Sequence, residues 1–251
     1  MIYAKPPITE AVIEFQFAGK CPESERNRVG RKLKKFYPFE ENIQELTVTS
    51  GPDGTDRHMS SVGLKLSTLD RSNVVSLTDL RKSPLPVLFN KDEGKPASFS
   101  AAQLAPYFGW NNFCQKFVEN WTVVERTIGK RKLRRIGVRF VNRIDIPGKI
   151  DDTQDWVRVG PFLPEDFGQP IVFNMHVIIP IDRMTQANLL VGTVPSPLPD
   201  YSSMILDIDI YTTGEIGDDM ASRLEILEYM HEKKNWIFED SITEATRNLF
   251  R

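Results

Sequence analysis

Arginine recurs at every fourth position in one segment of the chain, at Arg135, Arg139 and Arg143. Apolar residues alternate with them as in a β-strand, where each residue advances about 3.3 Å and successive arginines would stand about 13 Å apart on one face. Guanidinium groups form paired hydrogen bonds with phosphates and carboxylates. The row therefore predicts either a binding site for an anionic ligand or an ion network within the sheet.

Two aspartates and a histidine on other expected strands could share this face. Asp207 and Asp209 alternate with apolar residues in segment 203–211, and His176 lies in segment 171–181. Opposite charges on neighbouring strands attract, which favours an ion network, yet two aspartates would leave one of three arginines for a ligand. A histidine beside an aspartate could act as a general base. The candidate binding residues are therefore Arg135, Arg139, Arg143, Asp207, Asp209 and His176.

The middle arginine should be the best shielded of the three. Val138 and Phe140 flank Arg139 and should face the core, so we expect its guanidinium to be the least exposed in the row. A partly buried guanidinium needs an acceptor, and Asp207 and Asp209 are the first candidates by pattern.

The sequence has no recognisable motif for a metal, a cofactor or a catalytic nucleophile. His58, His176 and His231 lie in separate segments without the spacing of a metal site. His231-Glu-Lys-Lys-Asn235 begins like the zinc-protease motif but lacks its second histidine. Gly51-Pro-Asp-Gly54 indicates a hairpin turn rather than a phosphate-binding loop. We therefore expect no metal and no cofactor, and we favour a binding role over catalysis.

Basic residues gather in two segments, 23–37 and 126–135. The first predicts a helix whose exposed face carries Arg26, Arg28, Arg31, Lys32, Lys34 and Lys35. Nucleic acid binds such patches with strong salt dependence, and aromatic residues (Phe36, Tyr37 and Phe39) lie beside the first. The alternative is an ordinary solvated surface. The 32 basic residues stand against 34 acidic ones, so the whole chain has no general attraction for polyanions.

Hydrophobic periodicity divides the chain into strands and helices. Strands are predicted at 10–18, 43–49, 60–69, 73–79, 85–89, 133–146, 171–181, 186–194 and 203–211. Helices are predicted at 23–37, from Ala101 or Trp110 to Ile128, and at 151–158, 218–233 and 240–250. Phe113, Phe117 and Trp121 recur at helical spacing and predict an apolar stripe that ends before Gly129. Ser241-x-x-Glu244 predicts a capping box for the last helix.

This element order predicts an α+β fold: a mostly antiparallel, curved sheet with helices packed on one face. Both halves read strand, helix, three or more strands, long helix, so we expect one domain over 1–251 built from two pseudo-repeats, about 1–129 and 130–251, each a β-α-β-β-β-α unit. The order is similar to that of the TATA-binding-protein saddle. An open sheet edge needs cover, which a homodimer would supply.

Composition places the chain among ordinary globular proteins. Apolar residues make up 40% and charged residues 26% of its 251 positions. The N-terminus lacks the pattern of a signal peptide, and no run of about 18 apolar residues occurs. The two cysteines, Cys21 and Cys114, do not suggest a disulfide framework. We expect a cytoplasmic protein without membrane contact.

Three segments together resemble one family. They are Tyr3-Ala-Lys-Pro-Pro-Ile-Thr-Glu-Ala-Val-Ile-Glu14, Arg135-Ile-Gly-Val-Arg-Phe-Val-Asn-Arg-Ile-Asp-Ile-Pro147 and His231-Glu-x-x-Asn235-x-x-Phe238-Glu-x-Ser241-Ile-Thr-Glu244. The resemblance is to a sporadically distributed group of prokaryotic proteins of similar length without an assigned biochemical activity. It implies a single-unit protein found near mobile or accessory genes, and it supplies no catalytic residue.

Two functions stay open. The first is an interaction protein of an accessory, mobile or defence-like gene cluster, acting on a protein or nucleic-acid partner through its sheet face or a basic helix. The alternative is an enzyme or small-ligand binder for an anionic substrate that uses the Arg/Asp/His face.

Overall fold

The computed structural model describes residues 3–51, 54–80, 96–161, 163–168, 170, 172–213 and 215–251. The strand predicted at 85–89 and the middle of the turn at 51–54 lie outside these residues. In chain order, the described elements are β1 (Ile8–Phe17), α1 (Glu23–Leu33), β2 (Phe39–Gly51), β3 (Gly54–Ser67), β4 (Asn73–Asp79), β5 (Ala97–Leu104), α2 (Trp110–Ile128), β6 (Leu133–Pro147), two 3-10 turns (Thr153–Asp155 and Glu165–Phe167), β7 (Asn174–Pro180), β8 (Thr185–Val194), β9 (Tyr201–Thr212), α3 (Met220–Ser241) and α4 (Glu244–Phe250).

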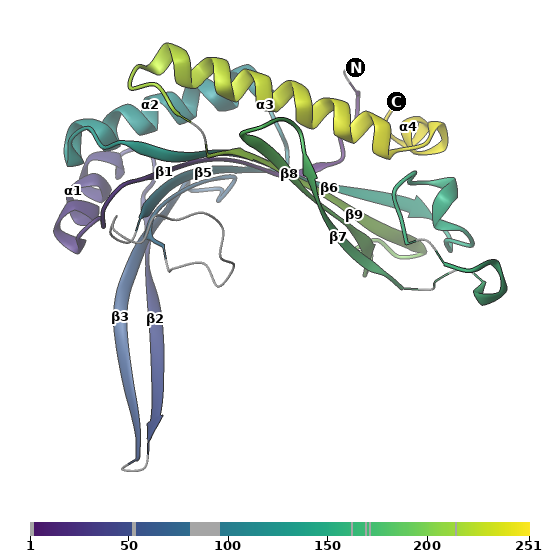
Figure 1. Ribbon diagram of the computed structural model, residues 1–251, viewed down its shortest axis with the longest axis horizontal. Helices are drawn as coiled ribbons and strands as arrows, with labels where there is room; N and C mark the ends of the chain where they lie inside the picture. Colours follow the sequence, from purple (N-terminus) through teal and green to yellow (C-terminus); the bar gives the residue numbers. More distant parts are fainter. Residues whose placement is uncertain are drawn as a thin grey trace. The chain divides into compact units, whose positions relative to one another are not determined.

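The described strands form one antiparallel sheet in the order β2-β3-β4-β5-β1-β6-β9-β8-β7. This confirms the predicted α+β class (Figure 1). The chain divides into two compact units. The α1–α2 unit comprises Ile13–Gln103 and Phe108–Arg135, and the α3–α4 unit comprises Met1–Val12, Leu104–Tyr107 and Ile136–Arg251. The internal duplication stays a prediction.

An aromatic core holds the α1–α2 unit together. The predicted stripe of α2 is confirmed, because Phe113, Phe117 and Trp121 are all buried. The ring of Trp121 lies 5.2 Å from that of Phe15 on β1 and 6.0 Å from that of Phe99 on β5, measured between centroids. Helix α2 therefore covers one side of these two strands.

Helix α2 begins at Trp110, so the alternative start at Ala101 is wrong. Residues Ala97–Leu104 form β5 instead, because every second side chain up to Gln103 is buried and the segment pairs with β4. Glycines with positive φ stand at both ends of α2, with φ 93° at Gly109 and φ 82° at Gly129. Gly129 therefore ends the helix as predicted, in a conformation that residues with a Cβ avoid.

Arg26 departs from the predicted exposed face of α1, since only 3% of it is exposed. Its guanidinium donates to the carbonyl oxygens of Cys21 (2.5 Å) and Ser61 (2.9 Å) and pairs with Asp79 at 3.1 Å. These contacts join α1 to β3 and β4 and satisfy a charge that would otherwise be costly to bury. The other five predicted residues, Arg28, Arg31, Lys32, Lys34 and Lys35, are exposed as expected.

In the α3–α4 unit, β6 pairs with β9 from Ile136 to Pro147, and β8 pairs with both β7 and β9. Alternate residues of β6, including Val138 and Phe140, are fully buried. Helix α3 lies on this apolar side, with Lys234 Nζ 4.0 Å from the centre of the Phe140 ring. In the described residues, no helix of this unit covers the other side of these strands (Figure 1).

The two C-terminal helices differ from the sequence prediction. Helix α3 continues to Ser241 instead of ending at 233, because Ile237 and Phe238 remain buried. The predicted capping box is wrong: Ser241 donates its hydroxyl to the Ile237 carbonyl at 2.7 Å, within α3. Helix α4 begins after Thr243, whose side-chain oxygen accepts a hydrogen bond from the backbone N–H of Thr246.

We expect Trp121→Ala to lower the free energy of unfolding by about 3–5 kcal/mol, because it removes a fully packed indole between β1 and β5. Urea denaturation followed by circular dichroism measures this. Trp236→Ala is the matched control, since 55% of Trp236 is exposed, and should change stability little. Equal effects of the two substitutions would contradict the prediction.

Candidate functional site

An ion pair stands at the centre of the open side of the α3–α4 unit. Arg139 on β6 donates from Nε to Asp207 Oδ1 at 2.9 Å and from Nη2 to Asp207 Oδ2 at 2.6 Å. The strand register places Arg139 directly opposite Asp209, so the guanidinium reaches diagonally to Asp207. The hydrogen bonds that Arg139 donates to Asp207 raise the pKa of Arg139, burial opposes this, and the charges of Asp207, Glu10 and Asp209 raise the pKa further.

A cavity of about 230 Å³ opens beside this ion pair. It is lined by Arg139, His176, Asn188, Leu190, Asp207 and Asp209, which come from the four strands β6 to β9. The pairing of the strands brings these residues together. Asn188 is opposite Asp209, while Leu190 is opposite both Asp207 and His176. Asn188 Nδ2 donates to Asp209 Oδ2 at 3.2 Å.

Four of the six residues predicted from the sequence therefore meet in one cavity, namely Arg139, Asp207, Asp209 and His176. The other two do not line it. Arg135 belongs to the α1–α2 unit and pairs with Glu14. Arg143 pairs with Asp145 on its own strand at 2.9 Å. Each of the three arginines thus has a carboxylate partner. This is the arrangement expected if the row forms an ion network within the sheet.

The expectation that Arg139 is the least exposed of the row is wrong. Its side chain is 47% exposed, against 17% for Arg135 and 33% for Arg143. Val138 and Phe140 do face the core, but strand alternation then turns Arg139 to the opposite side, which no helix of this unit covers in the described part of the chain.

The cavity has an acidic balance. Among the described lining residues, Asp207 and Asp209 stand against one cation, Arg139, and the charge of Glu10 on β1 also acts on that guanidinium. Because Asp207 already neutralises Arg139, the remaining field favours a ligand that brings positive charge and hydrogen-bond donors.

Asn188 and Leu190 are cavity residues that sequence reasoning missed. Both lie in the predicted strand 186–194, and alternation alone places them on one face. The missing information was the register with β9, which brings that face to the two aspartates.

A second group of polar residues lies on α3 itself, which packs on the covered side of the sheet. Lys234 is only 6% exposed, and burial lowers its pKa to about 8. Burial and the nearby Lys234 charge lower the pKa of His231 to about 4. His231 Nε2 lies 3.3 Å from Asn235 Nδ2, so the segment that begins like a zinc-protease motif pairs its histidine with an amide. No group of metal-ligating side chains occurs among the described residues.

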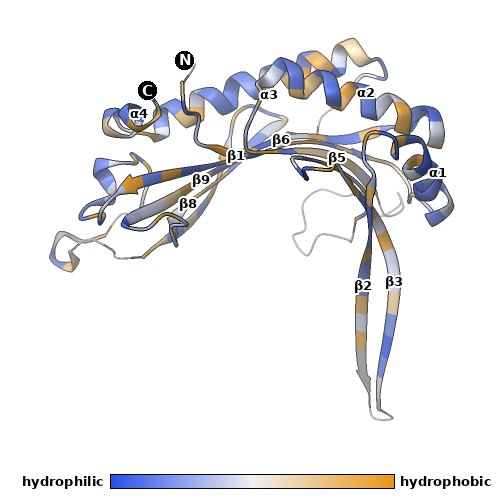
Figure 2. Ribbon diagram, turned by 180° about the vertical axis from the view of Figure 1, so that it is seen from behind, coloured by the Kyte–Doolittle hydropathy of each residue, from blue (hydrophilic) through white to orange (hydrophobic). Residues whose placement is uncertain are grey.

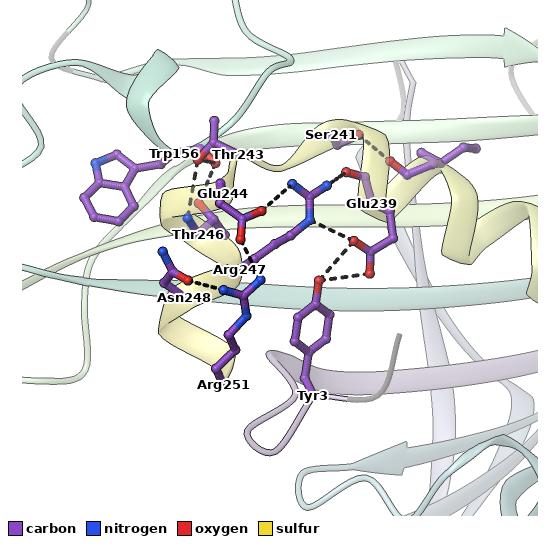
Figure 3. Close-up of polar contacts among 11 residues, drawn as sticks. Tyr3, Trp156, Glu239, Ser241, Thr243, Glu244, Thr246, Arg247, Asn248 and Arg251 are labelled. Carbon is purple, nitrogen blue, oxygen red and sulfur yellow. Dashed lines mark hydrogen bonds and ion pairs between the residues drawn. The ribbon is translucent and has the colours of Figure 1, made fainter.

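The first and last of the three segments that carry the family resemblance meet at the chain ends (Figure 3). The hydroxyl of Tyr3 donates to Glu239 Oε1 at 2.9 Å, and Arg247 Nε donates to Glu239 Oε2 at 3.1 Å. The Tyr3 ring packs edge-on against Phe250, with 5.4 Å between centroids. Burial, aided by Glu239, raises the pKa of Tyr3 to about 12. These contacts fasten α4 to the N-terminal segment.

No family model matches the chain, and no curated protein matches it either. None of the helices in the described residues is both long and apolar enough to cross a membrane.

We expect Arg139→Met and Asp207→Asn to be non-additive in a double-mutant cycle, with a coupling free energy of about 1 kcal/mol. The two-point geometry favours coupling, whereas the half-exposed guanidinium limits it through solvent screening. Urea denaturation of wild type, both single variants and the double variant measures the coupling. Additive single effects would contradict this ion pair.

We expect Lys234→Met to change how stability depends on pH. Between the folded pKa of about 8 and the ordinary value of 10.5, the unfolded state holds more protons at Lys234 than the folded state. Stability of the wild type relative to the variant should therefore rise by about 3 kcal/mol as pH increases from 7 to 11. Urea midpoints across this range measure it, with the exposed Lys149→Met as control. A pH-independent difference would contradict the buried ammonium.

Proposed function

We propose that this protein is a non-catalytic binding protein that docks a protein partner on the open side of β6 to β9 and seats one cationic side chain of that partner in the cavity. The observation that carries the proposal is the cavity of about 230 Å³ that brings together Arg139, Asp207, Asp209, His176, Asn188 and Leu190. The family resemblance supports a partner encoded among accessory or mobile genes.

The lining suits a lysine or arginine side chain. Leu190 offers an apolar surface for the aliphatic stem, since long basic side chains bury their methylenes and keep the charge near acceptors. The carboxylate of Asp209, oriented by the Asn188 amide, accepts hydrogen bonds from the charged head. Arg139 and Asp207 hold each other in place and form one wall.

A small-ligand binder or enzyme for an anionic substrate is the second candidate. The observation that favours it is Arg139, whose side chain is 47% exposed at the cavity. An anion would compete with Asp207 for this guanidinium and would approach two aspartates, which raises its cost of binding. A cationic side chain neither competes with Asp207 for Arg139 nor is repelled by the two aspartates.

The two candidates are separated by titrating the protein with N-acetyl-arginine amide and with inorganic phosphate, observed by NMR. We expect the arginine derivative to shift signals of β8 and β9 at low salt, and phosphate to leave them unchanged. Asp209→Asn should weaken binding at least several-fold. Asp240→Asn, an exposed α3 position, is the control of equal charge change. Phosphate binding that depends on Arg139 would support the second candidate instead.

Partner capture tests the docking surface in the cell. Three baits are compared: the wild type, Asp209→Lys and Asp240→Lys. Asp209→Lys places a positive charge in the cavity, which should repel a cationic side chain of the partner. We expect one protein to be retained by the wild type and by Asp240→Lys and lost with Asp209→Lys. Identical captures by all three baits would contradict the proposed surface.

A further inference from the structure

The solvent side of α1 carries a continuous row of basic residues. Arg28, Arg31, Lys32 and Lys35 follow the spacing i, i+3, i+4, i+7, which places them on one face of a helix. Helix α1 ends at Leu33, and Lys34 keeps a helical backbone conformation, so the row extends just beyond the helix. The opposite face is buried in the α1–α2 unit, and most of α1 is coloured hydrophilic in Figure 2.

Few carboxylates neutralise this row. Arg28 lies 4.0 Å from Glu25, but Glu25 is already held by Arg131 at 2.5 Å. Arg31, Lys32 and Lys34 form no ion pair with any residue that the structure describes. Apart from Arg28, the row is therefore a local concentration of positive charge without ion pairs among the described residues.

The 130–132 loop extends the positive surface past the start of α1. Arg131 Nη1 donates to the Lys20 carbonyl at 2.6 Å, and its other terminal nitrogen bonds Glu25, so the loop rests against this end of the helix. Lys20, Lys130 and Lys132 are exposed there. We call the residues Lys20, Arg28, Arg31, Lys32, Lys34, Lys35, Lys130 and Lys132 the basic surface.

A cavity of about 280 Å³ lies at the other end of α1. Its lining includes Phe36 and Tyr37 after α1, Lys116 and Asn120 on α2, and Asn73 on β4. Phe36 is 64% exposed and offers an aromatic face, whereas Asn120 is only 8% exposed and donates to the Tyr37 hydroxyl at 2.7 Å. An aromatic plane beside amide and hydroxyl groups is what an unstacked nucleobase requires.

We propose that the α1–α2 unit binds single-stranded nucleic acid, with the basic surface on consecutive phosphates and one base stacked on Phe36 at this cavity. A duplex keeps its bases stacked and would leave the cavity unused. A lipid bilayer would need an apolar face on α1, but Val29 and Leu33 are buried within the unit, each 1% exposed. This inference rests on residues separate from the β6 to β9 cavity.

Fluorescence anisotropy with labelled 15-mers of oligo(dT) and oligo(rU) tests the proposal. We expect wild-type affinity to fall steeply between 50 and 200 mM salt, as roughly three to five phosphate contacts require. Arg31→Glu/Lys32→Glu/Lys35→Glu should lose at least tenfold. Lys149→Glu/Arg158→Glu/Arg183→Glu, exposed residues of the α3–α4 unit, carries the same charge change and should lose much less.

Phe36→Ala separates stacking from charge. It should weaken binding by roughly 5- to 150-fold while leaving the salt dependence unchanged, because stacking is worth about 1–3 kcal/mol per base. Arg31→Gln/Lys32→Gln replaces the charge reversal if that variant does not fold. Equal loss in the control triple variant, tighter binding of a 15-base-pair duplex, or vesicle binding without oligonucleotide binding would each overturn the proposal.

Discussion

Strand alternation in β6 assigns every second side chain to a different environment. Phe140 points to the covered side, where it meets Lys234 and the ring of His231 at 6.2 Å. Its neighbour Arg139 points to the open side, where it meets Asp207. A shift of one residue in register would bury the arginine and expose the phenylalanine, so the apolar side of the sheet fixes the polar arrangement of the other.

The partners of each basic side chain depend on whether the fold places it toward solvent or in the interior. Arg139 forms a two-point ion pair in which its hydrogen bonds to Asp207 outweigh the burial that opposes the charge and keep its pKa raised. Lys234, on the covered side, rests on an aromatic face and has its pKa lowered by burial. Arg26 is the third case, a buried guanidinium surrounded by carbonyl and carboxylate acceptors. Basic residues thus have three different roles: Arg139 forms a cavity wall, Lys234 lies in the core, and Arg26 anchors a helix.

The sequence predicts which residues share a face better than it predicts what lies opposite them. Alternation placed Asp207 with Asp209 on one face of their strand, because it depends only on local geometry. The structure then brings both of them, with His176, to the side of Arg139. Asn188 was missed, because cavity membership depends on the β8–β9 register. Arg26 was assigned to solvent, because its acceptors come from β3 and β4, which are distant in sequence. Long-range pairing is the information that local pattern lacks.

Near-neutral total charge conceals two local fields of opposite sign. The lining of the β6 to β9 cavity has one carboxylate more than its guanidinium, whereas on the basic surface Arg28 alone has an acidic partner among the described residues. Salt screens charges over about 10 Å at ordinary ionic strength, so a ligand responds to the nearest cluster rather than to the net charge of −2. The overall balance of 32 basic against 34 acidic residues therefore does not reveal the charge that a ligand would meet at either surface.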